Sequence, residues 1–201
     1  MSKDIRIRKK NLRKKILALR DALSQEERKR KSVSIHKHLF SLPEFASAQT
    51  VAFFIAFKSE VLTEPMIREA LSLSKTVVVP ITDLTQRKLL FSRLIDFSED
   101  LSPGTLGILE PKPACVRPVP LEEIDLVITP GAVFDRTGNR IGYGGGFYDG
   151  LLSSVGKPAV ALAFSVQIVE RVPTEPGHDV PVDMIITEEG ITRCKGSGSR
   201  F

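Results

Sequence analysis

The chain has 201 residues, of which 42% are hydrophobic and 26% are charged, values typical of one globular domain with a substantial core. No apolar run approaches the ~20 residues that a membrane-spanning helix needs, and the first residues lack the apolar segment of a secretory signal. We therefore expect a cytoplasmic protein with no membrane contact. Cys115 and Cys194 match no metal or redox spacing and are expected to be free thiols.

The net charge of +5 is unevenly distributed along the chain. Residues 1–40 carry 14 Lys and Arg against 4 Asp and Glu, whereas the remaining residues are mildly acidic. A basic arm of this kind occurs in proteins that bind nucleic acid and in proteins that bind an anionic small molecule. For most of these lysines a solvated helix face is a sufficient explanation.

Residues 4–23 are predicted to form an amphipathic helix. Its apolar stripe follows the helical period and consists of Ile5, Leu12, Ile16, Leu19 and Leu23. Lys9, Arg13 and Arg20 border this stripe. We expect Lys9 and Arg13 to bury their aliphatic stems and to present their charges at the edge of the core, while the other basic residues meet water.

The rest of the chain is predicted to alternate between helices and short buried strands. A capping box beginning at Ser24 starts a second helix that ends before Pro43. Further helices are expected at 64–74 and 148–154, and residues 95–123 read as a long irregular connection. Apolar runs predict strands at 51–57, 76–81, 88–94 (an edge strand), 126–131, 159–164 and 183–187.

This order of elements predicts a single α/β domain over residues 1–190. We expect three α/β/α layers around a mostly parallel sheet, a Rossmann-like arrangement, and a disordered tail at 191–201. Ligands of such sheets bind beyond the carboxyl ends of the strands. Three segments are expected at these ends, namely 57–60, 131–149 and 178–183.

The segment GNRIGYGGGFYD at 138–149 concentrates four glycines within five positions. It lacks the GK[ST] ending of a Walker A loop and the spacing of the GxGxxG dinucleotide fingerprint. Consecutive glycines still allow their amides to converge on an anion, and a helix beginning near Phe147 would add its dipole. Arg140 suits phosphate oxygens, and Asp149 suits a Mg²⁺ that bridges phosphates. A tight hairpin without a ligand is the structural alternative.

Two further carboxylates are candidate site residues. Glu60 could pair with the donor-rich edge of a heterocycle whose faces Ile55 and Phe57 cover, or it could be a surface residue or a helix cap. Asp183 could share a metal with Asp149, or it could be a turn residue. The three histidines have no metal-ligand spacing, and no catalytic triad can be recognised.

The segment RIGYGGGFYDGLL closely resembles the RxGxGGGxYD signature of the 5-formyltetrahydrofolate cyclo-ligase family. The resemblance extends over residues 3–190. Its other matches, in chain order, are KKNLR (9–13), FKSEVLTEPM (57–66), DLVITPGAVFD (125–135), ALAFSVQ (161–167) and PVDMIITE (181–188). This ordered set is far more specific than the glycine motif alone.

The resemblance implies that ATP and Mg²⁺ drive the cyclisation of 5-formyltetrahydrofolate to 5,10-methenyltetrahydrofolate, with release of ADP and phosphate. Phosphorylation of the formyl oxygen would give an iminium phosphate, so no protein nucleophile is required. The implied ATP-binding residues are Lys9, Arg13, Arg140, Ile141, Gly142, Tyr143, Gly144, Gly145, Gly146, Phe147 and Tyr148. Arg140 would also stabilise the transferred phosphoryl group.

The implied folate-binding residues are Ile55, Phe57, Glu60, Tyr143, Gly144, Gly145, Gly146 and Phe147, and Asp149 and Asp183 would hold Mg²⁺. Many family members carry tyrosine where this chain has Phe147, and the position of Tyr143 varies. We expect a monomer whose partners are small molecules. A non-catalytic nucleotide- or RNA-binding module is the main alternative, although no RNA-binding motif is present. A sugar-phosphate isomerase or acyl-CoA transferase rests on fold analogy alone.

Overall fold

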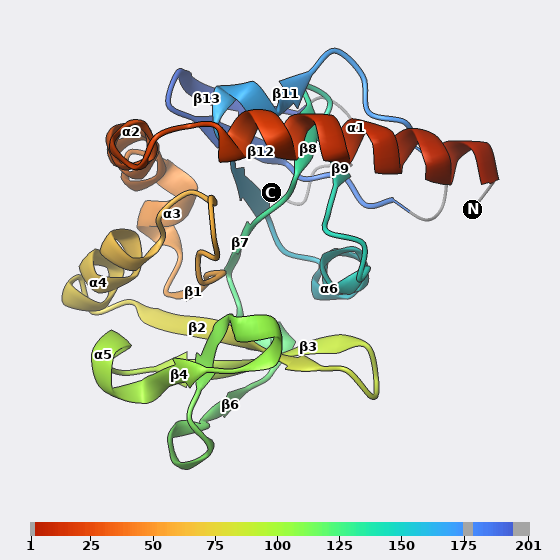
Figure 1. Ribbon diagram of the computed structural model, residues 1–201. Helices are drawn as coiled ribbons and strands as arrows, with labels where there is room; N and C mark the ends of the chain where they lie inside the picture. Colours follow the sequence, from red (N-terminus) through yellow and green to blue (C-terminus); the bar gives the residue numbers. More distant parts are fainter. Residues whose placement is uncertain (1–2, 175–178, 195–201) are drawn as a thin grey trace.

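The computed structural model describes residues 3–174 and 179–194, which form an α/β fold around one large sheet (Figure 1). In the described chain this sheet has eight strands in the order β13-β12-β10-β7-β1-β2-β3-β6. They are β1 (Thr50–Ala52), β2 (Thr76–Asp83), β3 (Lys88–Leu94), β6 (Pro118–Val119), β7 (Leu126–Thr129), β10 (Ala159–Leu162), β12 (Met184–Thr187) and β13 (Gly190–Arg193). Strands β12, β10, β7, β1 and β2 are parallel neighbours, whereas β3 and β13 run in the opposite direction.

Helices cover both faces of this sheet. The helices α2 (Gln25–Phe40), α3 (Pro43–Ser47) and α4 (Glu64–Ser72) pack on one face, and α6 (Phe147–Val155) packs on the other. Because successive strand residues point to opposite faces, Val51 joins the core beneath α2 and α4, whereas Ala52 joins the core beneath α6. The prediction of one three-layer α/β/α domain is therefore confirmed.

A second, smaller sheet follows the carboxyl end of β7. It contains β11 (Ile168–Val169), β8 (Val133–Asp135) and β9 (Arg140–Ile141) in that order. Its β8–β9 turn reaches the amino end of β12, where the Val182 amide donates to the Gly138 carbonyl at 2.9 Å. The helix α1 (Lys3–Asp21) lies across it (Figure 1). Ile16 of this helix packs with Val133 and Ile141. Strands of two or three residues are too short for a periodic pattern, so the sequence did not predict this sheet.

The inward face of α1 differs from the predicted apolar stripe. Leu19 is 49% exposed, whereas Arg20 is only 4% exposed. The expectation that Arg20 meets water is therefore wrong. Its partners are polar groups from distant segments, and hydrophobic periodicity contains no information about such partners.

The strand expected at 51–57 is much shorter in the structure. Strand β1 ends at Ala52, and after the Phe53 amide donates to the Val78 carbonyl at 2.9 Å the chain continues through residues 54–57 as buried and partly buried chain outside the strand. Side chains replace the missing ladder bonds, since Thr63 Oγ1 accepts from the Ala56 amide at 3.0 Å and Glu60 Oε2 accepts from the Phe57 amide at 2.9 Å. An apolar run alone cannot distinguish this arrangement from a strand.

The connection at 95–123 is mostly irregular, as predicted, but it also contributes to the sheet. It contains the short helix α5 (Phe97–Asp100), a hairpin of β4 (Leu101–Pro103) and β5 (Leu109–Pro111), and the 3₁₀ turns η1 (Thr105–Gly107), η2 (Pro113–Cys115) and η3 (Leu121–Glu123). Its last strand, β6, pairs with β3. Strand β3 is therefore not the edge strand that the sequence suggested.

The end of the described chain is ordered further than expected. Strand β13 pairs antiparallel with β12, so the prediction of a disordered tail is wrong for residues 191–193. Residues 195–201 of the expected tail lie outside the described residues. Among the described residues, no helix is both long and apolar enough to cross a membrane.

The packing of α3 on the sheet gives a direct test of the core. Phe45 is 1% exposed and packs against Phe40 and Phe53. We expect Phe45→Ala to lower the free energy of unfolding by about 3–5 kcal/mol, because it leaves a large cavity. Leu84→Ala, at a residue that is 61% exposed, should change it by less than about 0.5 kcal/mol. Urea denaturation of both variants measures these values, and equal effects would contradict this account of the core.

Candidate active site

The glycine-rich loop at 142–146 lies at the carboxyl side of the sheet, between β9 and α6. Gly144 and Gly146 have φ angles of +106° and +74°, which lie in the left-handed region that favours glycine. Gly146 is the N-cap residue of α6, and no side-chain hydrogen bond caps this helix. The first amides of α6 can therefore serve an anionic ligand.

Two guanidinium groups flank this loop. A Cβ on Gly142 would lie 3.3 Å from Nη1 of Arg140, and a Cβ on Gly144 would lie 3.3 Å from Nη1 of Arg13. Arg13 Nη1 also donates to the carbonyl oxygen of Gly142 at 3.4 Å. The glycines thus let the backbone approach two permanent positive charges, as an anion-binding loop requires.

Arg140 lies beneath the loop and holds Asp149. Its Nη2 donates to Asp149 Oδ1 at 2.9 Å, its side chain is 2% exposed, and its guanidinium lies 5.9 Å from the centre of the Tyr148 ring. Its Nε has no hydrogen-bond partner among the described residues. Burial lowers the pKa of Arg140, and the charges of Asp149 and Asp179 oppose this shift. Arg140 therefore orients Asp149 directly.

Three further residues of the predicted segment, Ile141, Phe147 and Tyr148, are buried or partly buried. Ile141 is 4% exposed and packs with Ile16 in the core, so only its backbone faces the loop. The Phe147 ring packs so closely over Gly145 that a Cβ there would lie 2.6 Å from the ring. Burial raises the pKa of the Tyr148 phenol well above its ordinary value, so this phenol stays protonated at neutral pH.

Lys9 reaches a carboxylate that the sequence reasoning missed. Its Nζ lies 2.6 Å from both carboxylate oxygens of Asp179, and Lys9 is 9% exposed. Asp179 also acts electrostatically on Arg140, which places it on the same side of the molecule as the loop. The predicted segment 178–183 contains two aspartates, Asp179 and Asp183, and this was the available signal. The sequence analysis selected Asp183 as the candidate. His178 lies outside the described residues.

Asp183 is not brought to the loop. It precedes β12, whose amino end lies beside the amino end of β10, at the edge of the sheet opposite the site. Its Oδ2 accepts from the Ala159 amide at 2.8 Å, and the residue is 2% exposed. The expectation that Asp183 shares a metal with Asp149 therefore lacks support, and Asp183 instead aligns β10. The described residues contain no cluster of three or more side chains able to hold a metal ion.

A second cluster forms around Glu60, which is 8% exposed. Its Oε1 accepts a hydrogen bond from the Tyr143 hydroxyl, and Arg20 Nη1 donates to that same hydroxyl oxygen at 2.6 Å. Arg20 Nε also donates to Ser59 Oγ at 3.0 Å. Burial raises the pKa of the Glu60 carboxyl, whereas the hydrogen bonds from Tyr143 and Phe57 and the charge of Arg20 lower it. Only the border position of Arg20 on α1 could have indicated its role.

Glu60 lines a narrow pocket at the end of β1. The pocket has no space wide enough for a water molecule, so a ligand must widen it. Its walls are Arg20, Phe54, Glu60, Val61, Pro130, Gly131, Leu162 and Gln167. Gln167 is 2% exposed and ties the strand ends together by donating to the Gly131 carbonyl at 2.8 Å. Ile55 is 5% exposed and belongs to the core, whereas Phe57 is half-buried beside Lys58.

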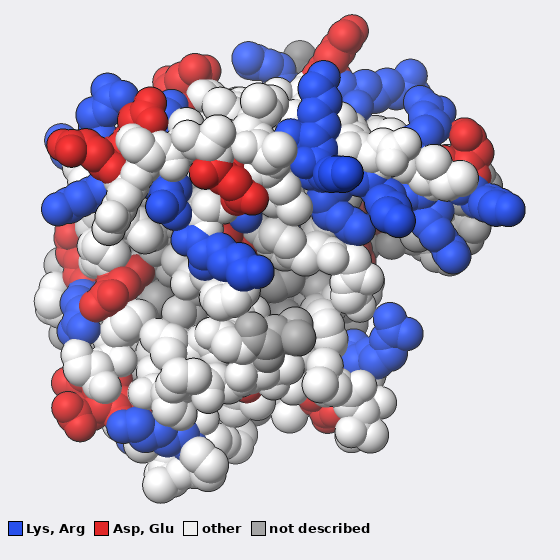
Figure 2. Space-filling model, viewed as in Figure 1, with Lys and Arg blue, Asp and Glu red and all other residues white. Residues whose placement is uncertain are grey.

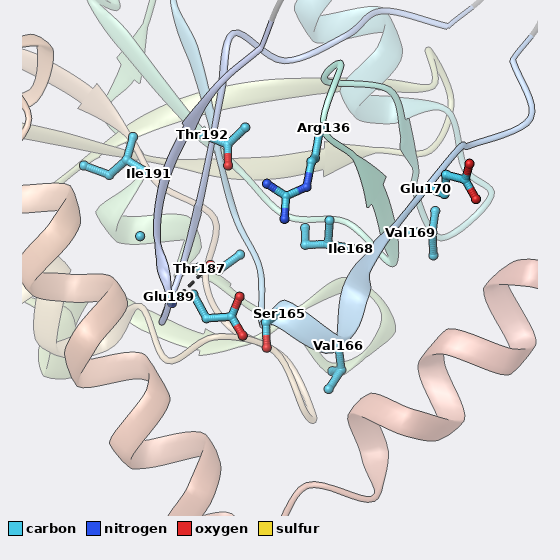
Figure 3. Close-up of a pocket in the computed structure, with 11 residues that line it drawn as sticks. Arg136, Ser165, Val166, Ile168, Val169, Glu170, Thr187, Glu189, Ile191 and Thr192 are labelled. Atoms are coloured by element: carbon cyan, nitrogen blue, oxygen red, sulfur yellow. Dashed lines mark hydrogen bonds between the residues drawn. The ribbon is translucent and has the colours of Figure 1, made fainter.

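Other surface features lie around this site. Basic side chains gather along α1 at the upper right of Figure 2. An open groove lies between β11 and β13, and Arg136 points into it (Figure 3). None of the residues that line this groove belongs to the glycine loop or to the Glu60 cluster.

Comparisons with known proteins agree on one family. The sequence model of the 5-formyltetrahydrofolate cyclo-ligase family matches residues 6–188. The chain is 32% identical to the 5-formyltetrahydrofolate cyclo-ligase of Haemophilus influenzae, with 87% of this chain and 95% of the relative covered. It is 30% identical to the mouse protein of that name, with 90% and 94% covered.

A solved structure is similar over nearly the whole chain. The 5,10-methenyltetrahydrofolate synthetase of Aquifex aeolicus superposes with a TM-score of 0.82 at 36% identity, covering 95% of each chain. The synthetase of Mycoplasma pneumoniae, at 23% identity and a TM-score of 0.71, supports the fold. From the family match and these relatives, the chain belongs to the 5-formyltetrahydrofolate cyclo-ligase family.

Proposed function

We propose that this protein uses Mg-ATP to convert 5-formyltetrahydrofolate to 5,10-methenyltetrahydrofolate, ADP and phosphate. The observation that carries the proposal is the glycine loop between the guanidinium groups of Arg13 and Arg140, beside the buried carboxylate of Glu60. It combines a cradle for phosphates with an acceptor for a heterocycle. Family membership supports the choice of substrates.

The chemistry explains why the phosphate-binding loop and the folate pocket must be adjacent. A formamide oxygen is a poor leaving group, so the formyl oxygen first attacks the γ-phosphorus of ATP and ADP departs. The resulting iminium phosphate is attacked at carbon by the 10-nitrogen of the folate, which loses its proton, and the former formyl oxygen leaves with phosphate. These steps depend on positioning and charge neutralisation and need no protein nucleophile.

The phosphates of ATP would bind against the glycine loop. Lys9 and Arg13 supply cations from α1, and the uncapped first turn of α6 supplies amides. Arg140 is paired with Asp149 and almost fully buried, so it would act on the phosphoryl group chiefly by fixing that carboxylate. The loop residues 140–148 come from one segment and require no second chain, which is consistent with a monomer.

The carboxylates near the loop fit Mg²⁺ bound together with ATP. Mg²⁺ is commonly held by one or two carboxylates plus substrate phosphates, so a complete cluster of protein ligands is not required. Asp149, in the first turn of α6, is partly exposed and directed by Arg140. Asp179 would supply the second carboxylate in place of Asp183. When bound, the ion would neutralise charge on the phosphates.

The folate would bind in a widened form of the pocket at Glu60. The pterin ring presents several N–H donors along one edge, and an ionised glutamate offers only acceptors. Phe54, Val61 and Leu162 line the pocket and would contact the ring. Phe57, whose amide donates to Glu60, and the backbone of Ile55 complete the predicted folate segment. Phe147 lacks a hydroxyl, so its contribution is limited to packing of its ring.

The nucleic-acid alternative has less support. Arg20, one of the basic residues on α1, turns toward partners within the protein and is not available to a phosphate backbone. The remaining basic residues on α1 are mostly exposed. RNA binding that persists at physiological salt would favour this alternative.

The proposed reaction has a simple assay. Purified protein with 5-formyltetrahydrofolate and Mg-ATP should produce the absorbance of the conjugated methenyl product, with one phosphate released per product. Omission of ATP should abolish the signal, because the formyl oxygen then has no activated leaving form. Absence of both product and folate-dependent phosphate release would refute the proposed function.

Substitutions of Asp149 and Asp183 are expected to affect different properties, namely the Mg²⁺ requirement and the stability. Asp149→Asn should reduce turnover at least about tenfold and raise the Mg²⁺ concentration needed for half-maximal rate, on the scale seen when a metal ligand's support is lost. Asp183→Ala should instead lower stability by about 1–3 kcal/mol, because it leaves the Ala159 amide unpaired. Titration of activity with Mg²⁺, together with thermal unfolding, separates these effects. An altered Mg²⁺ requirement in Asp183→Ala alone would contradict this assignment.

Substitutions of Gly145 and Gly150 distinguish an effect on loop geometry from an effect on helix stability. Gly145→Ala should lower kcat/KM for ATP by about 10- to 100-fold, because its Cβ displaces the Phe147 ring and shifts the loop. Gly150→Ala, inside α6 and facing open space, should raise the free energy of unfolding by about 0.5–1 kcal/mol. Its activity should remain near that of the wild type. The prediction fails if both variants behave alike in the kinetic assay.

A further inference from the structure

Arg20 and Glu60 form a buried pair of opposite charges bridged by one hydroxyl group. Arg20 is 4% exposed and Glu60 is 8% exposed, and both bond to the hydroxyl of Tyr143. The three residues come from α1, from the segment after β1 and from the glycine loop. This triad therefore joins three separate segments at the pocket proposed for folate.

The charge of Arg20 stabilises the ionised form of Glu60 in this cluster. A buried carboxylate is strongly disfavoured unless a positive charge and hydrogen bonds compensate it. The titratable groups that act on Glu60 are Arg20 and Tyr143, and the phenol of Tyr148 lies close enough to sense its charge. On the other side of Arg20, Asp21 lies 4.0 Å from its Nε. Arg20 is thus the positive charge that opposes the effect of burial on Glu60.

The hydrogen bonds fix the orientation of the carboxylate as well as its charge. The Phe57 amide donates to one oxygen and Tyr143 donates to the other. A carboxylate has about four acceptor positions, so about two remain for a ligand. A protonated Glu60 would present a donor and would lose part of this capacity. Both the ionisation and the orientation of Glu60 therefore affect how it binds a donor-rich ring edge.

We propose that Arg20 is a positioning residue for folate binding, which keeps Glu60 ionised and aligned, in part through the hydroxyl of Tyr143. The inference rests on the proposed function, because it concerns the substrate that Glu60 would bind. Arg20 need not touch the substrate. Its Nε is anchored to Ser59 independently of the glycine loop, so its charge stays beside Glu60 if Tyr143 moves aside to widen the pocket.

The test compares Arg20→Met with Arg20→Lys from pH 6 to pH 9. Without Arg20, the pKa of Glu60 rises further, so Glu60 protonates as pH falls through a higher value than in the wild type. In Arg20→Met, KM for 5-formyltetrahydrofolate should therefore increase at least about tenfold near pH 6 and less near pH 9. Arg20→Lys should restore much of the wild-type pH profile, because it keeps the charge.

Two controls make the outcome specific. Arg6→Met removes a charge of the same sign from an exposed position of α1 and should leave the pH profile unchanged. In a Glu60→Gln background, which cannot ionise, Arg20→Met should add no pH dependence. KM for ATP should stay near the wild-type value in the Arg20 variants.

The alternatives give distinct results. A pH-independent increase in KM, equal in Arg20→Met and Arg20→Lys, would mean that Arg20 only packs and would overturn the inference. An unchanged KM in Arg20→Met would overturn it as well. A wild-type protein that forms no methenyl product would instead refute the proposed function itself. Tyr143→Phe, which keeps both charges, provides a second variant if Arg20→Met fails to fold. Because it removes a hydrogen bond that lowers the pKa of Glu60, it should raise KM more near pH 6 than near pH 9.

Discussion

The site depends on cations of α1 that turn toward the protein. Lys9 contacts Asp179, Arg13 contacts the Gly142 carbonyl, and Arg20 contacts Ser59 and Tyr143. Ile16 supplies the main apolar contact of this helix. These directional polar contacts, added to the apolar packing, give the helix a defined rotation and position, because each hydrogen bond tolerates only small displacements. The glycine loop and the segment at Glu60 are therefore placed relative to each other by one rigid element.

The charges around the loop are already paired without a ligand. Arg140 is paired with Asp149 and Lys9 with Asp179, so the cradle is nearly balanced in charge. A bound nucleotide and metal ion would exchange some of these partners for phosphate oxygens and for the ion. Such groups are aligned in advance, which limits the reorganisation that ligand binding requires. The left-handed glycines allow this alignment, since a side chain at Gly144 would crowd Arg13.

Much of the fold and about half of the site could be predicted from the sequence. The parallel strands were recognisable because residues such as Val51 and Ala52 are buried on opposite faces and therefore read as continuous apolar runs. Arg13, the glycines, Arg140 and Asp149 lie within one helix or one loop, where spacing indicates proximity. The contacts of Arg20 and Asp179 join segments more than 100 residues apart, and no local pattern specifies such contacts.

The misplacement of Asp183 has a related cause. Two aspartates four positions apart precede β12, and only one reaches the loop side of the molecule. The choice depends on where the chain crosses from the carboxyl to the amino edge of the sheet. Next to Asp183 the Val182 amide donates to the Gly138 carbonyl at 2.9 Å, a tertiary contact that no local pattern specifies.

The single helix α1 has a thermodynamic consequence for the two ligands. Its first half carries the cations near the proposed phosphate site, and its last turn carries the arginine beside the pocket proposed for folate. Whatever restrains one end of a continuous helix also restrains the other end. Binding at the two proposed sites is then linked, and linkage between two binding equilibria is reciprocal. A nucleotide that favours one placement of α1 therefore changes the affinity for folate by some factor. Folate changes the affinity for the nucleotide by that same factor.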